Sequence, residues 1–249
     1  MTLLKTIAAA FSAYSALPMP QFPWEARYTR HAICAFPLVG AVLGAVLLLW
    51  HWLWNLLGGG PVLFGAVAAC LPLLLTGGIH MDGFMDTVDA LASHQSRERK
   101  LEIMKDSACG AFAVLYCGVY LLLSFGLYHA VSGSSMIGCG LLFVLSRCLS
   151  ALCAVTMPHA RKAGMLHAFT AQVEKKRAVA ILVILTVLTG SAMVVFAPVS
   201  LVLGLLTMVW YRWFAKKQFG GVTGDTAGFF LQICELVMLF GIWIGGLLV

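Results

Sequence analysis

Charged residues are scarce in this chain of 249 residues. They make up 10% of it, against roughly 25% in soluble domains, whereas apolar residues make up 61%. Apolar runs recur along the whole length, and most are long enough to cross a hydrocarbon layer about 30 Å thick. The composition excludes a soluble enzyme with one anchor. It predicts an all-α, polytopic integral membrane bundle in which residues 1–249 form a single domain.

The sequence also lacks the patterns of several other classes. Its eight cysteines contain no CxxC pair, so we interpret them as small core residues rather than as a disulfide or zinc framework. The N-terminus lacks the cleavage site of a signal peptide, so we interpret residues 1–31 as a retained cytoplasmic segment. The net charge of +6 is scattered in short clusters. We therefore expect a lipid bilayer, and no nucleic acid, as a partner.

Uncharged stretches of about 17–25 residues predict about seven transmembrane helices. The second stretch is interrupted by Pro72 and by the pair Gly77 and Gly78. The seven are Ala32–Leu57, Pro61–Ile79, Ala111–Val131, Met136–Met157, Ala178–Ala197, Val199–Ala215 and Thr226–Val249.

Basic residues indicate the orientation, because short cytoplasmic loops retain lysine and arginine. All of them except Arg147 fall before the first span, between spans two and three, between spans four and five, or, for Arg212, Lys216 and Lys217, at the end of span six and just after it. The other connections carry no charge. This alternation predicts that the N-terminus and the acidic region at residues 80–110 lie in the cytoplasm. The sequence leaves open whether the protein forms a homo-oligomer.

Three aspartates follow directly on the second span. On a helix, Asp82, Asp86 and Asp89 lie within roughly 60° of one another, so their carboxylates share one face. Like charges at this spacing repel each other, and a divalent cation would relieve the repulsion. Oxygen ligands favour a hard ion such as Mg²⁺. The alternative is a solvated acidic helix, but the lysines usually interleaved on such a helix are absent here.

His80, directly before this face, is either a ligand of the metal or phosphate or an interfacial residue with a hydrogen bond. Downstream, residues 97–107 predict a short charged helix. Glu98 and Glu102 can pair with neighbouring basic residues, among them Lys105, as on an ordinary surface helix. Asp106 is the stronger metal candidate, because it ends this helix just before the next span.

A glycine-rich turn, residues 220–228, opens the last predicted helix. Backbone N–H groups of Thr223 and Gly224, with a helix N-terminus behind them, favour a phosphate or carboxylate. Asp225 adds a further carboxylate to the metal candidates. Glycine turns before helices also serve as simple caps, and this alternative stays open.

Two charges fall inside spans. Arg147 and Glu235 lie at similar predicted depths, near 15 Å at about 1.5 Å per residue. A charge in mid-membrane costs at least ~2.5–3.5 kcal/mol, so each needs an opposite charge, a metal or water, and we hypothesise that the two are partners. Such a pair either locks two helices or helps to hold a ligand deep in the bundle.

The position of the acids separates three classes of function. A transporter generally has its ionisable residues near the midplane on broken helices, whereas most acids here lie at the boundary. A structural subunit has no use for three unpaired aspartates. An enzyme that binds Mg²⁺ and a diphosphate needs them.

At these residues the chain resembles a known family, cobalamin synthase, the adenosylcobinamide-GDP ribazoletransferases. Four separated motifs carry the resemblance, in order along nearly the whole chain. They are Thr76–Gly83 with Asp86 and Asp89, Glu102–Ser107 with Gly110, Ser146–Arg147, and Gly220–Thr226 with Gly228 and Glu235.

The resemblance implies a multi-pass enzyme of the bacterial cytoplasmic (inner) membrane with its active site facing the cytoplasm. It implies a Mg²⁺-dependent step in which α-ribazole, or its 5′-phosphate, displaces GMP from adenosylcobinamide-GDP. Asp82, Asp86 and Asp89 would be catalytic and, with Asp106 and Asp225, would bind the metal. His80, Lys105, Arg147, Thr223 and Gly224 would bind substrate, with support from Glu102 and Glu235.

The alternative enzyme class is the CDP-alcohol phosphatidyltransferases, which also hold a metal diphosphate with aspartates on membrane helices. Their pattern has Ala-Arg after the first Asp-Gly, whereas here Gly83 is followed by Phe84 and Met85. The sequence fits that pattern poorly. An ion-coupled transporter that uses Arg147 and Glu235 is the alternative outside enzymes.

Overall fold

The computed structural model describes residues 2–20, 25–106, 108–131, 133, 135–161 and 164–248. Two positions named in the sequence predictions, Ser107 and Val249, lie outside this part, as does Lys162 of the basic connection after the fourth span. Helices account for 82% of the structure. The helices are α1 Thr2–Tyr14, α2 Ala26–Thr29, α3 Ala32–Leu56, α4 Pro61–Thr76, α5 Ile79–Ala92, α6 Arg97–Ile103, α7 Ala111–Ala130, α8 Ser135–Thr156, α9 Met165–Thr170, α10 Lys175–Phe196, α11 Pro198–Phe219 and α12 Gly224–Leu247. The predicted all-α class is confirmed.

Six helices are long and apolar enough to cross a membrane, namely α3, α7, α8, α10, α11 and α12. The shorter α4 occupies the second predicted span. It passes the same test only together with α5, as one bent pair, so the described residues contain six spans, or the predicted seven if that pair counts as one. The observed bounds lie within a few residues of the predicted ones. The largest difference is at the end of α11, which continues to Phe219 and so carries Lys216 and Lys217 in its last turn.

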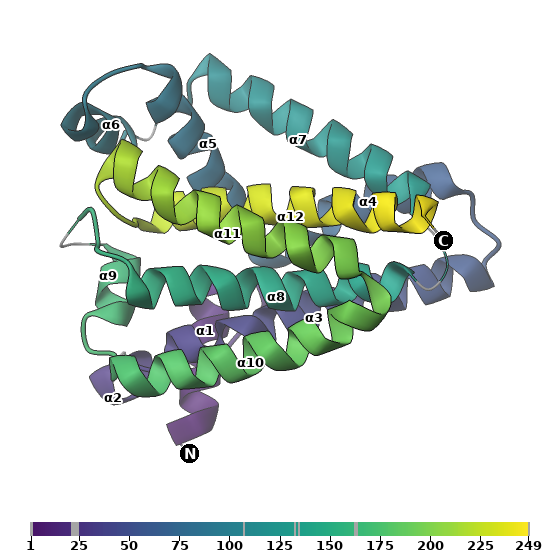
Figure 1. Ribbon diagram of the computed structural model, residues 1–249, viewed down its shortest axis with the longest axis horizontal. Helices are drawn as coiled ribbons and strands as arrows, with labels where there is room; N and C mark the ends of the chain where they lie inside the picture. The colour runs from purple at the N-terminus through teal and green to yellow at the C-terminus, as the bar shows by residue number, and fades with distance from the viewer. Residues whose placement is uncertain are drawn as a thin grey trace.

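A sharp bend separates α4 from α5. The two helices meet at 95°, and the residues between them, Gly77 and Gly78, have left-handed backbone angles with φ of +64° and +75°. Glycine adopts this conformation without the steric penalty of a side chain. The bend turns α5 across the direction of the long helices and lays it against α12 (Figure 1).

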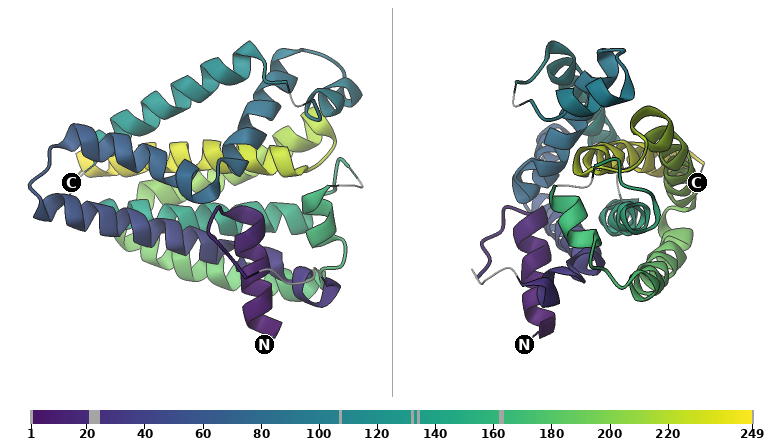
Figure 2. Two further views of the ribbon diagram at one scale, coloured as in Figure 1. Left: turned by 180° about the vertical axis from the view of Figure 1, so that it is seen from behind. Right: turned by 90° about the vertical axis from the view of Figure 1, so that its left-hand side faces the viewer.

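The short helices α2, α6 and α9 gather at one end of the bundle, whereas the chain ends at the opposite end (Figures 1 and 2). The connections from α5 to α6, from α8 to α10 and from α11 to α12 all lie at the end with the short helices. These are the connections that carry the basic clusters. We call this end of the molecule the basic end.

The buried core lies around α12, which packs against α5, α7, α8 and α11. Phe230, Cys234 and Met238 of α12 are fully buried. All eight cysteines are free, as predicted, but only four of them, Cys139, Cys148, Cys153 and Cys234, are buried in the core, whereas Cys70 and Cys109 are exposed. The outer helices expose apolar side chains instead, for example Leu122 on α7 and Leu188 on α10, which are 71% and 63% exposed. A bundle with an apolar exterior is suited to lipid contact.

Candidate active site

A cavity of about 220 Å³ opens at the basic end, where α5, α9 and the start of α12 meet. Its charged, more exposed side, the mouth, is formed by Asp82, Arg161, Gly224 and Asp225. Its buried side, the floor, is formed by Tyr14, Phe36, His80, Ser150 and Leu231. Two of the four separated sequence motifs therefore line one cavity.

A close crossing of α5 and α12 brings these motifs together. A Cβ atom on Gly83 would lie 2.8 Å from the backbone of Asp225, and one on Gly228 would lie 2.8 Å from the carbonyl oxygen of His80. Real Cβ atoms do not approach other atoms so closely, so any side chain at either position would push the helices apart. The absence of side chains at Gly83 and Gly228 thus allows Asp82 and Asp225 to share the mouth.

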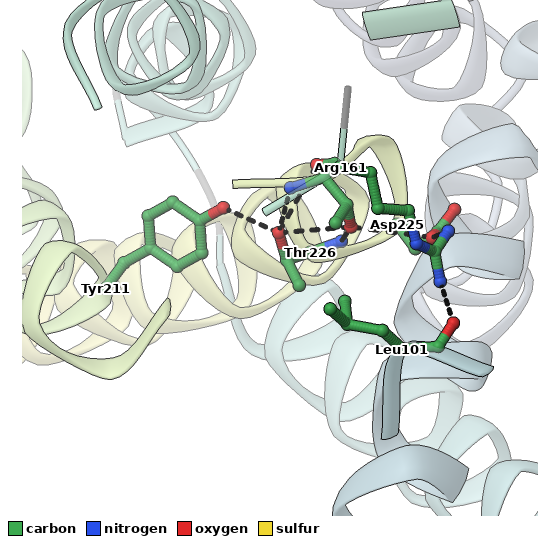
Figure 3. Close-up of polar contacts among 6 residues, drawn as sticks. Leu101, Arg161, Tyr211, Asp225 and Thr226 are labelled. Carbon is green, nitrogen blue, oxygen red and sulfur yellow. Dashed lines mark hydrogen bonds and ion pairs between the residues drawn. The ribbon is translucent and has the colours of Figure 1, made fainter. Parts of the chain in front are cut away.

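The start of α12 is fixed by a reciprocal cap. The Thr223 hydroxyl accepts a hydrogen bond from the Thr226 backbone N–H at 3.1 Å, and the Thr226 hydroxyl accepts one from the Thr223 N–H at 2.9 Å. Tyr211 of α11 donates its hydroxyl to Thr226 at 3.1 Å (Figure 3). Thr223 is therefore occupied as a helix cap, while Gly224, the first residue of α12, lies exposed at the mouth.

Arg161 was counted in the sequence only as a loop residue, and the structure brings it to the mouth. Its guanidinium Nη1 lies 3.2 Å from Asp225 Oδ2, and its Nη2 donates to the carbonyl oxygen of Leu101 (Figure 3). The Arg161 and Asp225 side chains are 20% and 28% exposed. A solvent-accessible guanidinium beside a carboxylate can also take a phosphate oxygen. The only sequence signal was its position in the basic loop after the fourth span.

Asp86 lies one turn further along α5, outside the long apolar spans. Partial burial and the carboxylates of Asp82, Asp225 and Asp89 raise its pKa from 3.8 to about 6. The carboxylates thus repel one another in the folded protein, as the sequence predicted. Among the described residues, no three His, Cys, Asp or Glu side chains converge closely enough to hold one ion by themselves.

Asp89 has a different set of contacts. Its two carboxylate oxygens accept hydrogen bonds from the backbone N–H groups of Gly110 and Ala113, at 2.6 and 2.9 Å. These N–H groups lie at the N-terminus of α7, where a carboxylate is favoured by the helix dipole. The structure therefore gives Asp89 a partner that the sequence did not indicate, and its metal binding stays a prediction.

A second hollow of about 340 Å³ lies on the far side of Asp89. Asp106 and Glu102 line it, with Glu102 paired to Arg99 at 2.8 Å on the surface of α6. Asp106 accepts a hydrogen bond from the Ala108 N–H at 3.0 Å. Neither acid lines the first cavity, and neither does the exposed Lys105. The predicted acidic region is thus divided between two hollows.

The two charges predicted inside spans do form a pair. Arg147 Nη1 of α8 lies 2.6 Å from Glu235 Oε1 of α12, and the side chains are 1% and 5% exposed. The same arginine nitrogen also reaches the Ser146 hydroxyl and the carbonyl oxygen of Phe143. Arg147 does not line the cavity at the basic end, so its predicted substrate binding stays a prediction.

These features define a class: a polytopic membrane protein with a cavity at its basic end, lined by carboxylates, an arginine and a helix N-terminus. The family model for cobalamin-5-phosphate synthase matches residues 6–243. The chain belongs to this family, as the sequence resemblance indicated, and it is an enzyme.

Curated relatives agree over nearly their full length. The adenosylcobinamide-GDP ribazoletransferase of Lachnoclostridium phytofermentans is 42% identical over 95% of this chain and 92% of its own. Enzymes of the same name from Desulfitobacterium hafniense and Clostridium botulinum strain Alaska E43 are 35% and 31% identical. They cover 94% and 96% of this chain, and the same shares of their own. No solved structure matches the chain.

Proposed function

We propose that this protein joins adenosylcobinamide-GDP to α-ribazole, or to its 5′-phosphate, and releases GMP. The product is adenosylcobalamin or its 5′-phosphate. The ribose 3′-hydroxyl oxygen forms a bond to the phosphorus attached to cobinamide, and the bond from that phosphorus to the GMP oxygen breaks. The hydroxyl proton passes to a carboxylate at the mouth, and GMP leaves as the phosphate anion.

Charge at the mouth suits this reaction. Arg161 and the N-terminus of α12 at Gly224 would bind the diphosphate oxygens through N–H donors. Asp82 is the exposed carboxylate at the mouth and the best-placed proton acceptor, because Asp225 is held by Arg161 and Asp89 by α7.

The carboxylates at and next to the mouth fit Mg²⁺ by charge and by ligand type. Asp82, Asp86 and Asp225 are oxygen donors with mutual repulsion to relieve. Because they do not converge on one point, oxygens of the diphosphate and of water would complete the site. When bound, Mg²⁺ supplies positive charge to the phosphate oxygens on which negative charge develops.

One observation carries the proposal: two acidic motifs far apart in the chain meet with Arg161 at one cavity. The test is to incubate the purified protein with adenosylcobinamide-GDP, α-ribazole and Mg²⁺, and to follow GMP and the corrinoid product by chromatography. A parallel reaction contains α-ribazole 5′-phosphate. We expect GMP and product in equal amounts, loss of both with a chelator, and recovery with added Mg²⁺.

The omission of ribazole is the decisive control. GMP released without ribazole would indicate hydrolysis, and no GMP in any mixture would contradict the proposal. Glu98→Gln is the matched control for variants of the aspartates, since Glu98 is an exposed acid on α6 outside both hollows.

We further propose that the protein lies in the bacterial cytoplasmic membrane with its basic end in the cytoplasm. The positive-inside rule and the gathering of the basic connections at one end support this orientation. A reporter fused after Val249 is expected outside the cytoplasm, and one inserted near Ser96 inside. Both on the same side would contradict a seven-span topology.

A further inference from the structure

The cavity has two chemically different ends. The mouth carries charge, whereas the floor is apolar and aromatic. At about 220 Å³ the cavity is smaller than the roughly 300–1,000 Å³ of pockets that enclose a drug-sized ligand. It can therefore hold one part of the substrates, and the corrin ring of adenosylcobinamide-GDP has to remain outside it.

Three rings wall the floor, and they come from three different helices. The Tyr14 ring of α1 packs on the Phe36 ring of α3 with 4.4 Å between centroids. His80 of α5 lies 5.6 Å from Phe36 and 6.4 Å from Tyr14, and its ring plane is tilted by 23° from that of Tyr14. Such a wall is suited to a flat ring, because offset and tilted ring contacts are favourable.

Two polar atoms of this wall are buried without a partner. The hydroxyl of Tyr14 and Nε2 of His80 have no hydrogen-bond partner in the part of the chain that the structure describes. Both side chains are more than nine-tenths buried, at 8% and 6% exposure. Buried polar groups in folded proteins are nearly always hydrogen-bonded. Two unpaired groups on one cavity wall indicate a partner that enters with a ligand.

We propose that the floor binds the base of the ribazole substrate and that Tyr14 or His80 donates a hydrogen bond to its free ring nitrogen, whose single lone pair accepts one donor. This inference rests on the proposed function. The ribazole base is a flat, largely apolar heterocycle whose only free polar atom is that nitrogen. Guanine, the other base in the reaction, has several polar edges and would leave most of them unpaired on an apolar floor. With the base on the floor, the ribose lies toward Asp82 at the mouth.

The proposal gives α1 a function. Tyr14 is the last residue of α1, and α1 packs against α3. The N-terminal segment thus closes the cavity wall, in addition to any contact with the membrane surface. Tyr14 and His80 act on binding and base choice, and neither has to touch the reacting phosphorus.

The first test distinguishes an effect on the binding of α-ribazole from an effect on the binding of adenosylcobinamide-GDP. Tyr14→Phe and His80→Phe keep a ring and remove a candidate donor, so we expect the KM for α-ribazole to rise about three- to tenfold in the variant that loses the donor to the base, and in the double variant. The KM for adenosylcobinamide-GDP should stay unchanged. His80→Gln keeps an N–H donor near the position of Nε2 and should recover part of the loss. Tyr128→Phe and His129→Phe, on α7 and away from this cavity, are matched controls.

A second test changes the ligand instead of the protein. In the indole analogue of α-ribazole a C–H group replaces the free ring nitrogen. The wild-type protein should prefer α-ribazole over this analogue by about the same three- to tenfold, and the Tyr14→Phe, His80→Phe double variant should show no preference. A preference retained in the double variant would overturn the proposal, as would a rise in the KM for adenosylcobinamide-GDP alone.

Equilibrium dialysis with α-ribazole alone separates this inference from the proposed function. If the wild-type protein releases no GMP, the proposed function fails. Binding of α-ribazole that is weakened by at least one of the two Phe variants, and not by the controls, would still support the floor as a base site. If the wild-type protein turns over normally and these variants match it in every measurement, only the inference is overturned.

Discussion

Two arginine–carboxylate pairs connect α12 to α8 and to the segment that follows α8, and their surroundings differ. Arg147 and Glu235 are almost fully buried, 2.6 Å apart, with further bonds from the arginine to Ser146 and Phe143. Arg161 and Asp225 are 3.2 Å apart, partly exposed, and lie at a cavity. The first pair is closed off from solvent, and its further hydrogen bonds go to neighbouring protein groups. The second can exchange one partner for a ligand.

The comparison predicts that burial, rather than residue type, separates a structural pair from a binding pair. Removing one partner of a buried pair leaves an uncompensated charge, whereas an exposed pair contributes little to stability. Variants of the two pairs should therefore change different measurements: stability for the buried pair and substrate affinity for the open one.

The largest effect is expected from the buried pair. Arg147→Met and Glu235→Gln should each lower the free energy of unfolding by about 3–5 kcal/mol, because each leaves a buried charge unpaired. The double variant should cost less than the sum. Denaturation of the purified protein in detergent measures all three. Strictly additive losses would mean that the pair makes no energetic contribution as a pair.

The next effect concerns catalysis at the open end. Asp82→Asn should lower GMP formation about 100-fold or more, because the mouth loses one unit of negative charge and its best-placed proton acceptor. Folding should be unaffected. With millimolar Mg²⁺ and a diphosphate ligand the wild-type protein should gain thermal stability, and this variant should gain less. Near-normal turnover with an unchanged Mg²⁺ response would contradict the metal assignment.

Arg161→Gln tests the open pair directly. The KM for adenosylcobinamide-GDP should rise about tenfold or more, because hydrogen bonds to charged groups are strong. The free energy of unfolding should change by less than about 1 kcal/mol. Steady-state kinetics and denaturation of the same preparation check both numbers. A loss of stability as large as that of Arg147→Met would remove the distinction between the pairs.

A smaller effect distinguishes the two ends of α5. Asp89→Ala should lower the free energy of unfolding by about 1 kcal/mol, since it leaves the N–H groups of Gly110 and Ala113 without their acceptor. Asp89→Asn keeps one oxygen that can accept a hydrogen bond and should lower the free energy of unfolding by less. Turnover should fall far less than in Asp82→Asn. A loss of activity in Asp89→Asn equal to that in Asp82→Asn would return Asp89 to the metal site.

The smallest effect is a pH dependence. The pKa of Asp86 is raised to about 6 by burial and by its acidic neighbours, so the folded protein binds this proton more tightly than the unfolded chain does. In metal-free buffer the contribution of Asp86 to stability is present below about pH 4 and is lost as the pH rises through 6. The thermal midpoint of the wild type, measured relative to that of Asp86→Asn, should therefore fall as the pH rises from about 4 through 6. An identical pH profile for the two proteins would contradict it.

The sequence determined the membrane architecture, because long apolar runs have no stable alternative to crossing the bilayer. It also determined that Arg147 and Glu235 meet, since the two charges lie at similar depths and each needs a partner. The positions of the spans and the interruption at Gly77 and Gly78 could be predicted for the same reason: each depends on residues close together in the chain.

Only the tertiary structure decided which carboxylates share a site. Helical periodicity put Asp82 and Asp89 on one face of α5. The close crossing at Gly83 brings Asp82 to α12. Hydrogen bonds from Gly110 and Ala113 instead hold Asp89 at the start of α7. Arg161 and Tyr14 reach the cavity from segments with no motif of their own. Such contacts depend on helix crossing angles and on close approach between distant segments, and a periodicity along one helix contains no information about either.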